Sequence, residues 1–174
     1  MFTIAIATTL SALALTTLPV RTQDVQAQAV PKQIDCQSLP GAGSFWDPIR
    51  IGAVDQTVVL VGCPALTAGD GYNHIYYSFD LIRPAPSGAI VGTSFIRVPG
   101  ATSAVHPRLA TSGGVTLLSS RRNGAWFEQP PATMRYLPIE GLPAGRYMLG
   151  AEKLGSPLGS LQTPSFNILI VLPS

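Results

Sequence analysis

The sequence has few charged residues and no long run of one sign. Only 11% of its 174 residues are charged, and the formal net charge is +2. The longest basic run is the pair Arg121-Arg122, which is too short to form the basic patch that holds a nucleic-acid backbone. So low a charge also excludes a disordered acidic or basic tail protein. We therefore expect a folded chain with no nucleic-acid partner.

Long helices are also unexpected, because the chain contains 17 Gly and 16 Pro. Each Pro removes a backbone donor, and each Gly adds entropy to the unfolded state. Short β-rich runs alternate instead with turn clusters at 64–71, 99–113 and 154–164. The pattern predicts an all-β chain, a single antiparallel β-sandwich of about seven to nine strands. The strands are expected near 45–52, 56–63, 72–82, 89–98, 114–122, 125–129, 133–140, 145–152 and 165–172.

The N-terminal stretch resembles an export signal. Residues 2–20 are apolar and rich in hydroxyls, and Ala27-Gln28-Ala29 follows with the small-x-small pattern that signal peptidase reads. We predict cleavage after Ala29, an N-terminal arm at 30–43, a sandwich domain at 44–174, and a secreted or periplasmic location. An uncleaved anchor is the alternative, although hydroxyl residues and Pro19 interrupt the apolar run. Contact with a membrane is expected only in that alternative.

Two cysteines, Cys36 and Cys63, remain in the exported chain. An even count in an oxidising compartment predicts one disulfide, which would tie the mature N-terminus to the body of the domain. A metal or a nucleophilic thiol would need partners that the sequence barely supplies.

One strand shows the alternation of a half-buried sheet most clearly. Its apolar face consists of Ile75, Tyr77, Phe79 and Leu81. Its other face consists of Tyr72, His74, Tyr76, Ser78 and Asp80. Because successive side chains of a strand point to opposite faces, the second face is expected to be solvated or to bind a ligand.

The dipeptide Asn123-Gly124 predicts a hairpin turn. Asn-Gly supplies the two positive φ angles of a type I′ turn, so the strands on either side would pair with Arg121 opposite Trp126. That register allows a cation–π contact between the two side chains. We predict a ligand surface that contains Trp126 and Arg121 together with Tyr72, His74 and Tyr76. Packing of these rings beneath the long loops is the alternative.

The segment 136–149, Tyr-Leu-Pro-Ile-Glu-Gly-Leu-Pro-Ala-Gly-Arg-Tyr-Met-Leu, carries a Leu-Pro-x-Gly-x-Tyr stretch. It resembles the entry to the penultimate strand of immunoglobulin-like sandwiches, including bacterial surface modules and fibronectin type III domains. The resemblance covers 136–172. It implies that the Tyr147 hydroxyl caps the corner loop and that the last two strands form a pair. The cysteine spacing departs from the antibody pattern.

Metal-binding motifs are absent from the sequence. The chain contains His74 and His106 but no HExxH, CxxC or EF-hand pattern. A blue-copper set would need both histidines, Cys63, and Met134 or Met148, and Cys63 stands too early in the chain for such a site. We therefore predict no metal and no cofactor.

Catalytic motifs are absent as well, since the chain has no Gly-x-Ser-x-Gly elbow. Two acid pairs exist, Asp70 with Asp80 and Glu128 with Glu140, and both fit turns and solvated strand faces better than paired catalysis.

These observations predict an exported, non-catalytic binding or structural module with a carbohydrate, peptide or protein ligand. A hydrolase of the cell envelope is the first alternative, with a loop site around Asp70, His74 and His106. An assembly subunit that keeps its N-terminal segment is the second. A pocket that holds both histidines with a carboxylate would favour the enzyme, whereas an aromatic face or an unpaired strand edge would favour the binding module.

Overall fold

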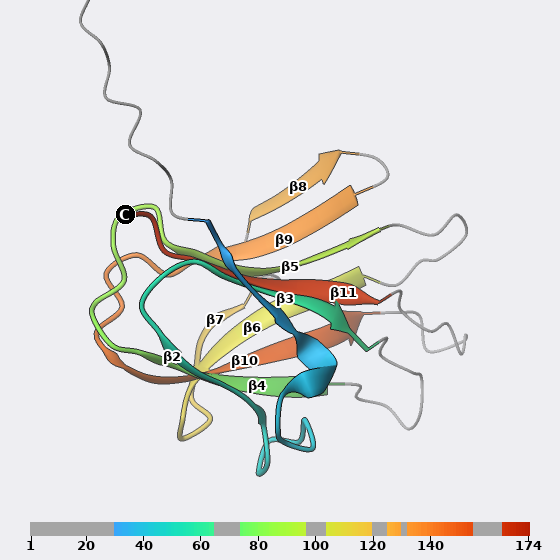
Figure 1. Cartoon of the computed structure of the whole chain (residues 1–174), viewed down its shortest axis with the longest axis horizontal. Coiled ribbons are helices and arrows are strands. Elements are labelled where there is room, and N and C mark those ends of the chain that lie inside the picture. Colours follow the sequence, from blue (N-terminus) through green and yellow to red (C-terminus); the bar gives the residue numbers. More distant parts are fainter. Residues whose placement is uncertain (1–29, 65–73, 97–103, 120–124, 130–131, 155–164) are drawn as a thin grey trace, which may run out of the picture.

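Two β-sheets pack against one another around a common core. The computed structural model describes residues 30–64, 74–96, 104–119, 125–129, 132–154 and 165–174. Figure 1 shows the strands in two layers, with the 3-10 turn η1 (Cys36–Ser38) after the first strand. The strands are β1 (Lys32–Asp35), β2 (Ile49–Val54), β3 (Val58–Cys63), β4 (His74–Leu81), β5 (Ile90–Ile96), β6 (Ala104–Thr111), β7 (Thr116–Ser119), β8 (Ala125–Gln129), β9 (Ala132–Pro138), β10 (Gly145–Leu154) and β11 (Phe166–Val171).

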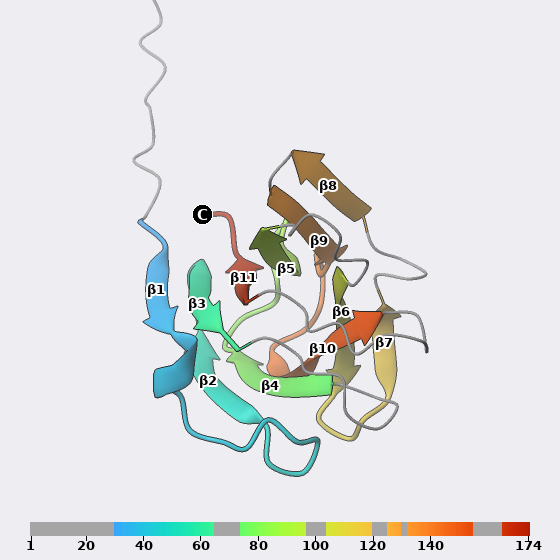
Figure 2. The same ribbon diagram turned by 90° about the vertical axis from the view of Figure 1, so that its right-hand side faces the viewer.

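The strand order is that of a jelly roll. The larger sheet runs β1-β3-β11-β5-β9-β8 and the smaller β2-β4-β10-β6-β7, as Figure 2 shows from the second side. Antiparallel ladders join β3 to β11, β4 to β10, β5 to β9, and β6 to β7. Such nested pairs arise when one long hairpin wraps into two sheets. Three further strands, β1, β2 and β8, extend the sheet edges.

This connectivity does not confirm the immunoglobulin-like prediction. The resemblance implied that the last two strands pair, but β10 and β11 lie in different sheets. The all-β, two-sheet prediction is confirmed at the coarser level.

The predicted Asn-Gly hairpin is also wrong. The turn itself lies outside the described residues, but the strands on either side belong to different sheets, because β7 pairs with β6 and β8 pairs with β9. In the β8–β9 register Trp126 stands opposite Arg135, while Arg121 lies outside the described residues. The two strands that the turn was expected to join, β7 and β8, therefore each pair with a different strand.

The core confirms the alternation predicted for β4. Tyr77, Phe79 and Leu81 are buried, and Ile75 packs against the buried cluster from its margin. The same core contains alternate residues of β10, which pairs with β4, and of β11 in the opposite sheet. Among them Leu149 and Ile168 are fully buried. Fully burying a side chain of this size stabilises the fold by about 1.5–3 kcal/mol.

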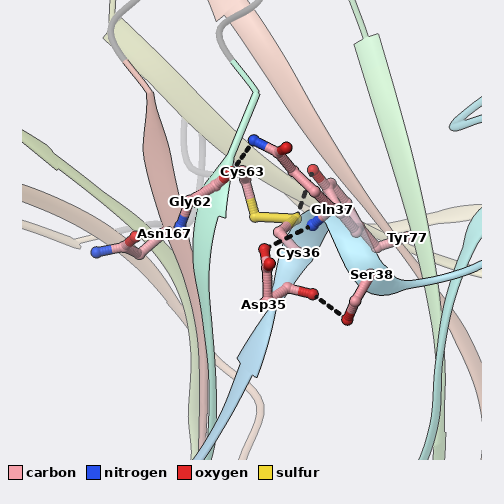
Figure 3. The surroundings of a disulfide bond; sticks show 8 residues. All are labelled: Asp35, Cys36, Gln37, Ser38, Gly62, Cys63, Tyr77 and Asn167. Carbon is pink, nitrogen blue, oxygen red and sulfur yellow. Dashed lines mark hydrogen bonds between the residues drawn. A yellow bond between two sulfur atoms is a disulfide. The ribbon is translucent and has the colours of Figure 1, made fainter.

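The predicted disulfide joins Cys36 to Cys63 (Figure 3). It ties β1 and η1 to the end of β3, with which β1 pairs in parallel. The Tyr77 hydroxyl, which comes from the opposite sheet, lies 3.6 Å from Sγ of Cys36 and donates to it. The bridge therefore fixes the segment predicted as an N-terminal arm against the core.

Strand β6 lies within 99–113, a segment predicted to be a loop because it is rich in turn residues, so that prediction is wrong for 104–111. The described pairing of β6 with β7 ends at Arg108 opposite Ser119, so Pro107 lies beyond that ladder. Proline is tolerated in a strand where no ladder bond has to be donated. The strand brings His106 into the smaller sheet.

Tyr147 occupies the corner position that the sequence predicted. Its hydroxyl donates to the Pro143 carbonyl oxygen at 2.8 Å, and the residue is buried. The corner therefore forms although the sheet order differs from that of the family that suggested it, which agrees with convergence of turn chemistry.

Replacing Tyr147 with phenylalanine should lower the free energy of unfolding by about 1–2 kcal/mol, because the Pro143 carbonyl loses its buried donor. Urea unfolding followed by circular dichroism measures the change. An unaltered midpoint would show that water replaces the hydroxyl without loss.

Candidate functional site

Several predicted ligand residues cannot be placed. Tyr72, Arg121 and Asp70 lie outside the described residues, and of Trp126 only the backbone is described. His74 and Tyr76 remain. They belong to the outer face of the smaller sheet, which we define by the alternate residues of β4 and their β10 partners: His74, Tyr76, Ser78, Asp80, Glu152, Gly150, Met148 and Arg146.

Of the two alternatives for Tyr76, a solvent-facing ring or a ring packed beneath a loop, the structure has the second, because a loop covers it. Phe45 meets the Tyr76 ring edge-on, with centroids 5.5 Å apart. The Tyr76 backbone N–H also donates to the Gly43 carbonyl at 2.9 Å. Tyr76 is therefore half-buried beneath the segment 41–48, which we name the Trp46 loop.

The Trp46 loop presents an aromatic ring that the sequence analysis did not single out. Trp46 is 90% exposed, and its ring meets that of Phe45 at an interplanar angle of 88°. It had been placed inside a strand at 45–52, but β2 begins only at Ile49. The turn residues around it, Gly41, Gly43 and Asp47-Pro48, are the signal that would have placed Trp46 in a loop.

Internal bonds fix the Trp46 loop. The Asp47 backbone N–H donates to Ser44 Oγ at 3.0 Å, and the Ala42 N–H donates to Asp47 Oδ2 at 3.1 Å. At the far side the Phe45 ring lies against Gly114, where a Cβ atom would stand only 2.7 Å from it. The loop is thereby held on the sheet before any ligand arrives.

A pocket of about 500 Å³ lies between this loop and the outer face. Phe45 and Met148 contribute apolar surface to it. Its polar lining includes Arg50, Ser78, Asp80, Ser112 and Arg146, and Trp46 stands on its margin.

Two ion pairs organise the charges here. Arg146 donates through Nε to Asp80 Oδ1 at 2.7 Å and through Nη2 to Oδ2 at 3.1 Å. The hydrogen bond from Arg146 holds the pKa of Asp80 below its ordinary value. Arg50 contacts Asp47 at 3.1 Å. Exposed pairs of this kind contribute little to stability. Each one gives an arginine of the pocket lining a carboxylate partner.

A second polar group lies at the end of the same face. Glu152 is 7% exposed, and its Oε1 lies 3.3 Å from His74 Nε2 and 3.4 Å from Arg108 Nη1. His106 stands opposite Glu152 in the β6–β10 register and is also buried. The structure thus places His74 in contact with Glu152 and His106 opposite it on the neighbouring strand. The predicted carboxylate, Asp70, lies outside the described residues.

The hydrogen bond from His74 is the largest influence that lowers the pKa of Glu152, while burial opposes it. Because the folded state prefers the ionised carboxylate, this group stabilises the fold above its unfolded pKa of about 4.5. The stabilisation is lost as the pH falls through the folded pKa. Unfolding midpoints between pH 7 and pH 3 should therefore fall less steeply for Glu152→Gln than for the native protein. Parallel curves would contradict this.

In the part of the chain that the structure describes, no group of three or more His, Cys, Asp or Glu residues is arranged to hold a metal ion. The same residues contain no helix with the length and apolar character needed to cross a membrane. No family model matches the chain, and neither the curated proteins nor the solved structures provide a significant match.

Proposed function

We propose that the protein is an exported binding module whose ligand occupies the pocket beside Trp46. The observation that carries the proposal is an almost fully exposed indole beside a pocket whose charged side chains are already oriented. Tryptophan and arginine are the residues most often found at binding hot spots, and preorganisation lowers the entropy lost on binding. Secretion into the periplasm or to the cell surface remains part of the proposal, supported by the N-terminal pattern.

The aromatic surface proposed here includes Trp46, which the sequence prediction did not contain, while the side chains of Tyr72 and Trp126 lie outside the described residues. Tyr76 contributes by supporting Phe45 from below, and Phe45 in turn contacts Trp46. The solvent-exposed Trp46 ring is thus supplied by a loop over the sheet. Tyr76 of β4 supports it indirectly, through Phe45.

Replacing Trp46 with alanine should weaken binding to insoluble cell-envelope material by about tenfold or more. The expected reason is loss of the exposed ring without a change to the core. Co-sedimentation with the envelope fraction measures the effect, and Ile82→Ala is the matched control, since Ile82 is also exposed but does not line the pocket. Equal losses for both variants, or no loss for either, would contradict the proposed site.

A second candidate, hydrolysis of envelope polymers, is favoured by the contact of His74 with Glu152 and by the position of His106 opposite Glu152 in the β6–β10 register. Binding ranks first because Arg108 and His74 both contact the same oxygen of Glu152, which is the arrangement of a structural ion pair. Release of soluble fragments by the native protein, abolished in His74→Ala but retained in Trp46→Ala, would establish the enzyme instead.

A further inference from the structure

We propose that the Trp46 pocket takes a neutral pyranose ring, as one unit of a polysaccharide or oligosaccharide. This inference rests on the proposed function, because it names the ligand class of the same pocket. Three properties of the described residues carry it: an open aromatic surface, a polar wall of fixed geometry, and balanced charge.

The indole of Trp46 is the aromatic surface. At 90% exposure at least one face of the ring is open to solvent. The Phe45 ring meets it edge-on, with the two ring centroids 5.1 Å apart. Phe45 itself lies between Tyr76 and Gly114. The C–H face of a pyranose is flat and apolar while its rim is polar, so it can stack on an aromatic ring and still reach hydrogen-bonding groups.

The polar wall consists of Asp80, Arg146, Ser78 and Ser112. The fork between Arg146 and Asp80 fixes both side chains. It leaves acceptor positions on the carboxylate and N–H donors on the guanidinium. Each hydroxyl on a sugar ring both donates and accepts, so two adjacent hydroxyls fit a neighbouring acceptor and donor. The serine hydroxyls can serve in either role.

The balance of charge favours a neutral ligand. Asp80 neutralises Arg146, and Asp47 neutralises Arg50, so the group carries no excess charge with which to attract a sulfate or a carboxylate. The volume of about 500 Å³ lies within the roughly 300–1,000 Å³ of small-molecule sites. An added peptide strand is disfavoured at this part of β2, because the Arg50 backbone N–H already donates to the Pro40 carbonyl.

The experiment is calorimetric titration of the full mature chain with soluble probes of two kinds. The neutral probes are oligosaccharides of β-1,4-glucan, β-1,3-glucan, α-1,4-glucan and mannan, and the acidic probes are oligogalacturonate and heparin fragments. At least one neutral probe should bind, and its affinity should fall by about tenfold or more in Trp46→Ala and in Asp80→Asn. Trp46→Phe should restore affinity to within about threefold, because a flat ring remains. Affinity should change less than about twofold between about 0.05 and 0.5 M NaCl.

The other outcomes overturn one proposal or both. If only acidic probes bind, or if no sugar binds while Trp46→Ala still weakens binding to the envelope fraction, the ligand class is wrong and the binding site stands. If Trp46→Ala changes neither, the site is wrong and both proposals fail. Circular dichroism of each variant separates lost contacts from lost folding.

Discussion

Replacing both Cys36 and Cys63 with alanine should lower the free energy of unfolding by about 3–4 kcal/mol. The bridge closes a loop with a sequence separation of 27, and removing it restores that loop's freedom to the unfolded chain. β1 is four residues long, and among the described strands it pairs with β3 alone, so the bridge is a large part of its attachment. Urea unfolding without reductant measures the change.

Reduction supplies the control for this prediction. Dithiothreitol should destabilise the native protein by a similar amount and leave the double variant unaffected. Amide exchange should quicken first in β1 and η1, since their attachment depends most on the bridge. A double variant as stable as the native protein would show that strand pairing alone secures the N-terminus.

Replacing Gly41 with alanine should destabilise the protein by about 3 kcal/mol or more and remove binding together with the Trp46 loop. Gly41 has φ +122°, and a Cβ atom there would stand 2.3 Å from the carbonyl oxygen of Pro48. The Cβ atom is fixed directly to the backbone and the Pro48 carbonyl is itself backbone, so no side-chain rotation relieves the contact and the base of the loop has to open. Trp46 then leaves its place beside the pocket. Urea unfolding and envelope co-sedimentation test the two effects.

Gly141→Ala is the matched control for this variant. Gly141 also has a positive φ, +77°, but nothing lies within 4 Å of the position of its Cβ atom. That variant should be destabilised only by the cost of placing alanine at a positive φ, about 1–2 kcal/mol. It should keep its binding. If Gly41→Ala binds as well as Gly141→Ala does, the loop base does not position Trp46.

Features set by local chemistry were predictable from the sequence. The alternation of Tyr77 and Phe79, the pairing of the two cysteines, and the corner hydrogen bond of Tyr147 each depend on a few neighbouring residues or on a simple count. The structure has all three.

Features set by long-range pairing were not predictable. Asn123-Gly124 favours a hairpin, but β7 and β8 find other partners in separate sheets. The turn-rich composition of 99–113 argues against a strand, but β6 forms there through its pairing with β10, and Pro107 lies beyond the described pairing with β7. Glu152 meets His74 and Arg108 only because β4 and β6 flank β10. One local signal was missed: the turn residues around Trp46 indicate a loop.

The wrapping of the chain also determines when it can fold. Thr57, just before β3, bonds through its hydroxyl with the backbone of Leu172 across 115 residues, and β3 and β5 gain their shared neighbour only when β11 arrives. Topologies of such high contact order fold slowly. A chain emerging from the ribosome therefore holds the apolar strands β3 and β5 without their shared partner until residues 166–171 have been synthesised. A nascent chain that lacks residues 166–174 should consequently be a substrate for chaperones and proteases rather than a folded intermediate.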